Sequence, residues 1–272
     1  MKRIAIKITI SVLAFACGVL VASIWNTNNF VETERSKVIE RPEPATPAAT
    51  VVPEPTPNHE VVFGGDRLRI VPTQVELRSE RLRYEIDVTY PQIVGGKDRH
   101  IRRLNQRMKR LATEQYAWAL QVTTKELEPL NGHFADVYNS IHLDYDVLLA
   151  TDSVLSIFFN GYSYGIGAAH GSQFSFVINY DLVADKELKL ARLFKPGSKY
   201  LEFISRYCSE ALSLDRDRAL EFTQDPDSWN ITRDGLSFHF DHCKFFACSE
   251  GYKNVEIPFA AMKEILNQAG SG

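Results

Sequence analysis

Hydrophobic and polar positions alternate along several stretches of the chain, and this period of two predicts β-strands with one buried face. The alternating stretches cover residues 82–90, 141–149, 154–159 and 173–182. The first is expected to end at Pro91. The glycine-rich stretch from Gly161 to Gly171 is expected to join two antiparallel strands, so a βαβ topology is not predicted.

Two other stretches repeat their apolar residues every three or four positions, as amphipathic helices do. The first lies between residues 99 and 119 and should cross a sheet, with a face of Arg99, Arg102, Arg103, Arg107 and Arg110. A solvated face is the simpler interpretation of these arginines, and a surface for anionic wall polymers or lipid headgroups is the alternative. The second helix is expected over residues 198–214, with Ser198 as its N-cap.

The C-terminal part predicts a hairpin followed by a strand and a helix. Asp234-Gly235 separates two short apolar runs, and residues 255–257 form a further candidate strand. Pro258 is expected to open a terminal helix that continues through Leu266. The predicted fold class is therefore α+β, with antiparallel sheets and packed helices after an N-terminal transmembrane helix.

The N-terminal segment, residues 1–25, has the pattern of a membrane anchor. Lys2, Arg3 and Lys7 precede an uncharged run from Ile8 to Trp25, which would span about 27 Å as a helix. Positive charges on the N-terminal side place that side in the cytoplasm. We expect a single-pass signal-anchor in the cytoplasmic membrane, with the rest of the chain on the periplasmic or extracellular side.

Cleavage or lipidation of this segment is the alternative. Ala14-Phe15-Ala16 has the A-x-A cleavage pattern, and Cys17 could carry a lipid. The apolar run continues to Ile24, beyond the position where either process would cut, which favours a retained anchor. Both alternatives export the domain.

Residues 26–60 have the composition of a tether. Six of the chain's twelve prolines lie between Pro42 and Pro57, among Glu, Thr and Ala, and such a segment buries too little apolar surface to fold. The remaining chain is expected to form two halves of one domain, residues 61–182 and 183–272.

Composition and charge narrow the classes of function. Hydrophobic residues make up 44% of the chain and charged residues 24%, as in ordinary globular proteins. A formal net charge of −3 provides no general basic field for a polyanion. Nucleic acid is therefore not an expected partner.

The segment Gly161-Tyr162-Ser163-Tyr164-Gly165 fits the G-x-S-x-G pattern of a hydrolase nucleophile, with Asp181 and His239 downstream. A nucleophile elbow requires a helix directly after the strand, whereas a second strand is predicted here. We therefore expect a hairpin loop, no catalytic residue and no cofactor.

His239, Asp241, Cys243 and Cys248 could be interpreted as a metal cluster, because alternate residues share one face of a strand. In an oxidising compartment, two cysteines five residues apart at a hairpin tip are more typical of a disulfide. We predict a Cys243–Cys248 disulfide and no metal, with Cys208 left over on a helix or paired with either of the two.

The binding candidates are His170, Tyr162 and Tyr164. Imidazole acts as acid, base or ligand near neutral pH, although a histidine among glycines commonly bonds to the backbone instead. The tyrosine rings could stack on sugars or anchor a protein, although tyrosines at strand ends often belong to the core edge.

A series of short motifs resembles a known family. The motifs are Thr89-Tyr90-Pro91, Asn105, Gly167-Ala168-Ala169-His170, Asn179-Tyr180-Asp181-Leu182, Leu193-Phe194-Lys195-Pro196-Gly197, Thr232-Arg233-Asp234-Gly235-Leu236 and Glu256-Ile257-Pro258. In this order they resemble the paired extracytoplasmic domain of RsiV-type lysozyme-sensing anti-sigma factors and of PdaC-type peptidoglycan deacetylases, where it is a noncatalytic region of unknown function. The resemblance covers about residues 74–266.

This resemblance implies an envelope binding module without the enzymatic part. Only seven residues precede the apolar run, which leaves no room for a cytoplasmic sigma-binding segment, and no deacetylase motif is present. The expected partners are a lysozyme-like protein or a peptidoglycan fragment. A small cell-wall hydrolase and a purely structural envelope protein are the alternatives, and Asp144, Asp146 and Asp152 offer the charge that a basic partner would need.

Overall fold

A computed structural model describes residues 61–65, 67–96, 98–122, 137–215, 228–240, 246 and 252–267. All of these residues lie in a compact unit that begins at Val52. The predicted anchor and tether, residues 1–60, lie outside them. Within the described ranges, no helix is long and apolar enough to cross a membrane.

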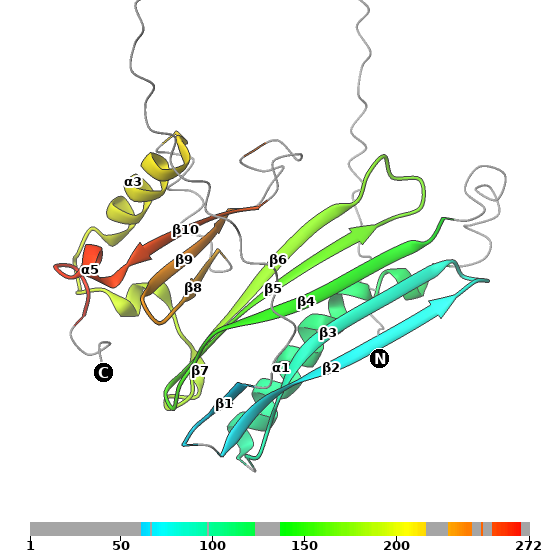
Figure 1. Ribbon diagram of the computed structural model, residues 1–272, viewed down its shortest axis with the longest axis horizontal. Coiled ribbons are helices and arrows are strands. Elements are labelled where there is room, and N and C mark those ends of the chain that lie inside the picture. The colour runs from blue at the N-terminus through cyan, green and yellow to red at the C-terminus, as the bar shows by residue number, and fades with distance from the viewer. Residues whose placement is uncertain are drawn as a thin grey trace, which may run out of the picture. The chain divides into compact units, whose positions relative to one another are not determined.

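The larger of two sheets has seven strands, in an order that follows the sequence (Figure 1). The strands are β1 (Val61–Phe63), β2 (Leu68–Ser79), β3 (Tyr84–Val94), β4 (Asn139–Ala150), β5 (Val154–Tyr164), β6 (Ser172–Asp181) and β7 (Lys186–Glu187). β5 and β6 are antiparallel, which confirms the prediction for the glycine-rich connection.

One pair of neighbouring strands is parallel. Tyr84 to Val88 of β3 pair with Asn139 to Leu143 of β4, and α1 (Arg99–Tyr116) lies between the two strands in the sequence. The expectation that the topology contains no βαβ unit is therefore wrong. Alternation reports which face of a strand is buried and carries no information about the direction of its neighbour.

Pro91 does not end β3, contrary to the sequence-based expectation. The strand continues to Val94, and Pro91 lies directly opposite Pro72 of β2. Two opposed prolines cannot exchange N–H···O bonds, so they suit a non-hydrogen-bonded pair. On the other side β4 pairs only as far as Val88, so the missing N–H of Pro91 removes no bond to β4.

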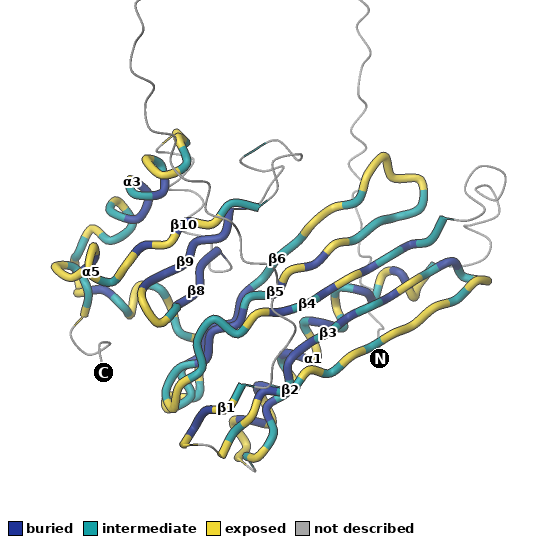
Figure 2. The backbone as a smooth tube through the Cα atoms, in the orientation of Figure 1, coloured by how far each residue is buried: buried dark blue, intermediate teal, exposed yellow. Residues whose placement is uncertain are grey.

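The helix α1 packs against this sheet, as its pattern predicted. Ile101, Leu104 and Met108 are buried in one cluster with Ile86 and Leu143. Figure 2 shows α1 beside β3, with buried residues along the strand. A short 3-10 turn, η1 (Ala119–Gln121), follows.

The smaller sheet has the strand order β10-β9-β8 and a separate core. Its strands are β8 (Trp229–Ile231), β9 (Gly235–Phe240) and β10 (Lys253–Pro258), accompanied by η3 (Leu190–Leu193), α3 (Tyr200–Leu212) and α5 (Phe259–Met262). Trp229, Phe238 and Ile204 are buried in this core. The hairpin at Asp234-Gly235 and the strand at residues 255–257 are confirmed.

Two helix boundaries differ from the sequence-based expectation. α3 begins at Tyr200 with Lys199 at the N-cap position, and the buried Ser198 hydroxyl has no hydrogen-bond partner within the described ranges. α5 ends at Met262 instead of continuing through Leu266. Leu266 forms a β-bridge with Phe194, and Ile265 accepts a bond from the backbone N–H of Lys195, which satisfies these backbone groups outside a helix.

The outer strands of the seven-stranded sheet are short. β1 pairs only with residues 68–70 of β2, and β7 pairs only with Tyr180 and Asp181 of β6. From Val71 to Ser79, β2 therefore has no outer partner strand among the described residues.

Candidate functional site

The predicted binding residues lie at one end of the β5–β6 hairpin. Tyr162 is 43% exposed, and its ring lies over Gly171, where any Cβ would collide with it. The Tyr164 hydroxyl donates to the carbonyl of Ala168 (3.1 Å). His170 is exposed, and its Nδ1 donates to the carbonyl of Gly171 (2.8 Å), so this histidine bonds to backbone.

The G-x-S-x-G segment does not form a nucleophile elbow. It runs along β5 into the hairpin connection, and the Ser163 hydroxyl donates to the carbonyl of Ser172 (3.4 Å). Asp181 is at the opposite end of β6, about 30 Å away at the rise of an extended strand. It accepts bonds from the N–H groups of Val183 and Ala184 and so stabilises a turn. The structure does not bring Ser163, Asp181 and His239 together.

Tyr162 belongs to a row of polar side chains across five strands. Residues directly opposite one another share one face of the sheet, and the strand register gives the order Glu76, Asp87, His142, Tyr162 and Gln173. The Gln74 amide donates to Glu76 (2.6 Å) and to Asp87 (3.3 Å), and His142 Nδ1 lies 3.3 Å from Asp87.

A second row on this face contains Asp144, Asn160 and Ser175. Asp146 follows Asp144 two residues later on β4, so both carboxylates point to the same side. Partial burial, followed by the nearby Asp144 carboxylate, raises the pKa of Asp146. We call the surface formed by these two rows and Asp146 the polar face. It is opposite α1, because Leu143 and Tyr145 between these positions are buried in the core.

The arginine face of α1 is partly paired with acids of the β6–β7 region. Arg103 forms an ion pair with Asp185, and Arg107 forms one with Glu187. Asp185 also accepts a bond from the Tyr180 hydroxyl (2.7 Å). These two guanidinium groups therefore connect the helix to the edge of its own sheet.

His239 lies in the interior and not in an open metal site. Its Nε2 donates to the Asn230 side-chain oxygen (2.7 Å), its Nδ1 lies 3.0 Å from the Asn254 side-chain oxygen, and its ring stacks on Phe158. Burial lowers the pKa of His239 to about 4, so the ring is neutral at pH 7.

The other members of the proposed cysteine and metal clusters are not placed. Asp241, Cys243 and Cys248 lie outside the described residues, so the disulfide stays a prediction. No group of residues suited to hold a metal is found within the described ranges. Cys208 is buried on α3 as a free thiol, and burial raises its pKa to about 12.

A buried network of amides connects the two sheets, and the sequence analysis assigned it no role. The Asn230 amide donates to the Ser156 hydroxyl (2.8 Å) and to the carbonyl of Ile157 (3.1 Å). The Ser156 hydroxyl donates to the Asn179 side-chain oxygen (2.8 Å), and the Asn179 amide donates to the carbonyl of Trp229 (2.7 Å). The only signal in the sequence was the place of Asn179 in a family-like motif.

Other family-like motifs also stabilise the backbone. Asn105 of α1 accepts a bond from the N–H of Ile93 and donates to its carbonyl, both at 2.8 Å. The Thr232 hydroxyl accepts from the N–H of Gly235 at the turn between β8 and β9 (3.1 Å). Local backbone structure therefore accounts for these motif residues.

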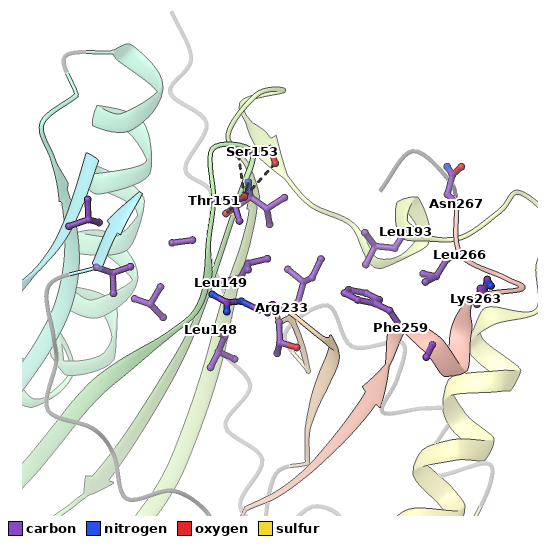
Figure 3. A pocket seen from close by; sticks show the side chains of 18 of the residues that line it. Leu148, Leu149, Thr151, Ser153, Leu193, Arg233, Phe259, Lys263, Leu266 and Asn267 are labelled. Atoms are coloured by element: carbon purple, nitrogen blue, oxygen red, sulfur yellow. Dashed lines mark hydrogen bonds between the residues drawn. The ribbon is translucent and has the colours of Figure 1, made fainter. Parts of the chain in front are cut away.

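A cavity of about 1010 Å³ lies between the β4–β5 hairpin and the small sheet with its helices. Figure 3 shows Leu148, Leu149, Thr151 and Ser153 on the hairpin side, with Leu193, Phe259 and Leu266 on the other. Arg233 extends from the β8–β9 turn towards the leucines. The sequence analysis singled out none of these as cavity residues, because they come from segments far apart in the chain.

Comparison with known proteins shows that two adjoining segments of the chain match family models. Residues 78–173 match the family described as deacetylase PdaC, and residues 191–260 match the family described as protein of unknown function, DUF3298. The resemblance of the short motifs to the noncatalytic region of PdaC-type deacetylases is therefore confirmed, and the resemblance to RsiV-type anti-sigma factors stays a prediction.

One curated protein is similar to this chain in sequence. The chain is 25% identical over 191 residues to the peptidoglycan-N-acetylmuramic acid deacetylase PdaC of Bacillus subtilis strain 168. The match covers 66% of this chain and 38% of that protein, so the chain corresponds to a minor part of its relative.

Two solved structures match this chain at low sequence identity. A member of the DUF3298 family from Bacteroides fragilis matches with a TM-score of 0.50 and 15% identity, over 73% of this chain and 94% of its own. A DUF3298 family protein from Pseudomonas aeruginosa matches with a TM-score of 0.48 and 18% identity, over 74% of this chain and 94% of its own.

Proposed function

We propose that this chain is a noncatalytic binding module of the bacterial cell envelope, held outside the cytoplasm by an N-terminal anchor. The relation to a peptidoglycan deacetylase supports the location. The polar face around Tyr162 supports the binding role, because it combines an exposed aromatic ring with flanking carboxylates and amides.

The charge of this face favours a basic protein, such as a lysozyme-like glycoside hydrolase, as the partner. Glu76, Asp87, Asp144 and Asp146 supply negative charge, and complementary charge speeds association and selects partners. A peptidoglycan fragment is the second candidate, since the curated relative acts on peptidoglycan by its printed name and a tyrosine ring stacks well on a sugar.

A binding titration tests the proposal. Residues 52–272 would be titrated with lysozyme and, separately, with soluble peptidoglycan fragments, with product analysis on the same samples. We expect saturable binding without new products, weakened at least tenfold by Tyr162→Ala, since a central aromatic anchor typically contributes ~2 kcal/mol or more. Binding to lysozyme should also weaken as salt rises.

Trp118→Ala is the matched control, because Trp118 is also an exposed aromatic (40%) and follows α1 on the other side of the sheet. Absence of binding to both ligands, or equal loss in the two variants, would contradict the proposal. Released glycan products would favour the alternative of a small cell-wall hydrolase.

A further inference from the structure

We propose that the cavity between the β4–β5 hairpin and the small sheet binds an amphiphile with one long apolar chain and an anionic headgroup. This site is remote from Tyr162, the aromatic residue on which the proposed binding role of the polar face rests. Val154 at the cavity and Tyr162 are eight residues apart on β5, about 27 Å at the rise of an extended strand. The inference therefore does not rest on the proposed function.

The walls of the cavity suit an apolar chain. Val61 and Val62 of β1 line it from one side, Leu149 and Val154 from the hairpin, and Phe259 and Leu266 from the C-terminal segment. Val62 is 48% exposed, although it is a large apolar residue on a strand. The volume of the cavity is at the upper end of the range for small-molecule sites, which are typically ~300–1000 Å³. Apolar walls of this extent favour a long hydrocarbon over a compact polar ligand.

The charged residues that line the cavity favour an anionic ligand. Its charged residues are Lys195, Arg233 and Lys263, and no carboxylate lines it among the described residues. The Lys195 ammonium already donates to the carbonyl of Glu264 (2.7 Å). For Arg233 and Lys263, no hydrogen bond or ion pair is found within the described part of the chain. Two cations beside an apolar wall leave a charge that an anionic headgroup would neutralise.

The neutral polar groups are less available than these cations. The Thr151 hydroxyl accepts from the N–H of Val154 (2.9 Å) within the β4–β5 turn. The Thr232 hydroxyl is bonded to Gly235. Since Figure 3 shows Arg233 extending into the cavity beside the leucines, we assign the headgroup contact to Arg233.

Calorimetric titration of residues 52–272 with hexadecanoate, octanoate and hexadecanol tests the assignment. We expect saturable 1:1 binding of hexadecanoate, at least tenfold tighter than octanoate, because each additional buried methylene adds affinity. Arg233→Glu should weaken hexadecanoate at least tenfold and leave hexadecanol within a factor of three. Ala260→Trp should reduce binding of both long-chain probes by filling the cavity.

Tyr162→Ala should leave all three affinities unchanged, which separates this site from the polar face. Near-ultraviolet circular dichroism of each variant would confirm that its tertiary packing is intact. The proposal is overturned if hexadecanoate does not bind, or if Arg233→Glu in its folded state binds it as tightly as the parent chain. Equal binding of hexadecanol and hexadecanoate would indicate a purely apolar groove and would overturn the anionic assignment.

Discussion

At the scale of single residues, His239 is a buried titratable side chain whose pKa is lowered. It is the one buried histidine among the residues that the structure describes, and its neutral ring donates from Nε2 to Asn230. The Asn254 side-chain oxygen lies 3.0 Å from Nδ1, and a neutral ring carries one N–H, so the ring can donate to only one of the two amide oxygens. Burial disfavours the charged ring and lowers its pKa, and the hydrogen bond with Asn254 offsets only part of this effect.

The depressed pKa of His239 predicts a loss of stability at mildly acidic pH. The unfolded chain takes up this proton below about pH 6.5, whereas the folded chain does so only near pH 4. Unfolding is therefore favoured as pH falls through this window, by about 2 kcal/mol at pH 5 and about 3 kcal/mol below pH 4. Urea denaturation at pH 7.5 and pH 5 would measure the difference.

The variant His239→Gln should be less stable at pH 7.5 and should lose most of this pH dependence. His142→Gln is the control, since His142 is exposed and should leave the pH dependence in place. The assignment is wrong if the parent chain and His239→Gln lose equal stability between the two pH values.

At the scale of elements, the crossover between β3 and β4 depends on one side chain of its helix. Asn105 of α1 forms two bonds to the backbone of Ile93, beyond the point where β4 stops pairing with β3. It takes the place of a neighbouring strand and so allows β3 to extend past its partner.

Asn105→Ala should destabilise the fold by about 1–3 kcal/mol, because the N–H and carbonyl of Ile93 lose their partners in a part-buried site. The free energy of unfolding from urea titration measures this. Gln106→Ala, at the next and exposed position of α1, should change it by less than about 0.5 kcal/mol. Similar effects of both substitutions would refute this role for Asn105.

The local pattern of apolar and polar residues was sufficient to predict most strands and the first helix. It was not sufficient to predict which strands pair or in which direction. The apolar alternation of residues 141–149 indicated the buried face of β4 correctly, whereas in β6 Val177 and Asn179 on the other face are buried as well. β3 and β4 pair in parallel, and α1 between them packs on one face of the sheet. The alternation of apolar and polar residues within a strand does not show the direction of the neighbouring strand. The prediction that the strand ends at Pro91 was wrong because Pro91 lies opposite Pro72 of β2. A local pattern does not reveal this pairing between residues that are distant in the sequence.

At the scale of the folded part of the chain, two cores are connected through polar groups. Ser156 and Asn179 belong to the large sheet and Asn230 to the small one, and all three are buried. Buried amides require exact partners, so this contact specifies one relative position of β5, β6 and β8. Neither these residues nor the cavity could be identified from sequence, because each depends on contacts more than fifty residues apart.

Asn230→Ala should reduce the cooperativity between the two sheets. It leaves Ser156 and His239 short of a partner, at an expected cost of about 2–4 kcal/mol. Native-state hydrogen exchange should then show β8 and β9 opening at lower free energy than β4 and β5. Asn160→Ala, at an exposed position of the polar face, is the control, and uniform loss of protection in both sheets would contradict the prediction.

The short outer strand β1 has a consequence for behaviour at high protein concentration. It leaves the backbone of β2 from Val71 to Ser79 without an outer partner strand among the described residues, and an open edge of this kind can recruit a strand from another molecule. Pro72 lacks an N–H, and Glu76 and Arg78 place charge along the same stretch. The edge is thereby a poor template for polymerisation, so the domain can remain dispersed when many copies are crowded together.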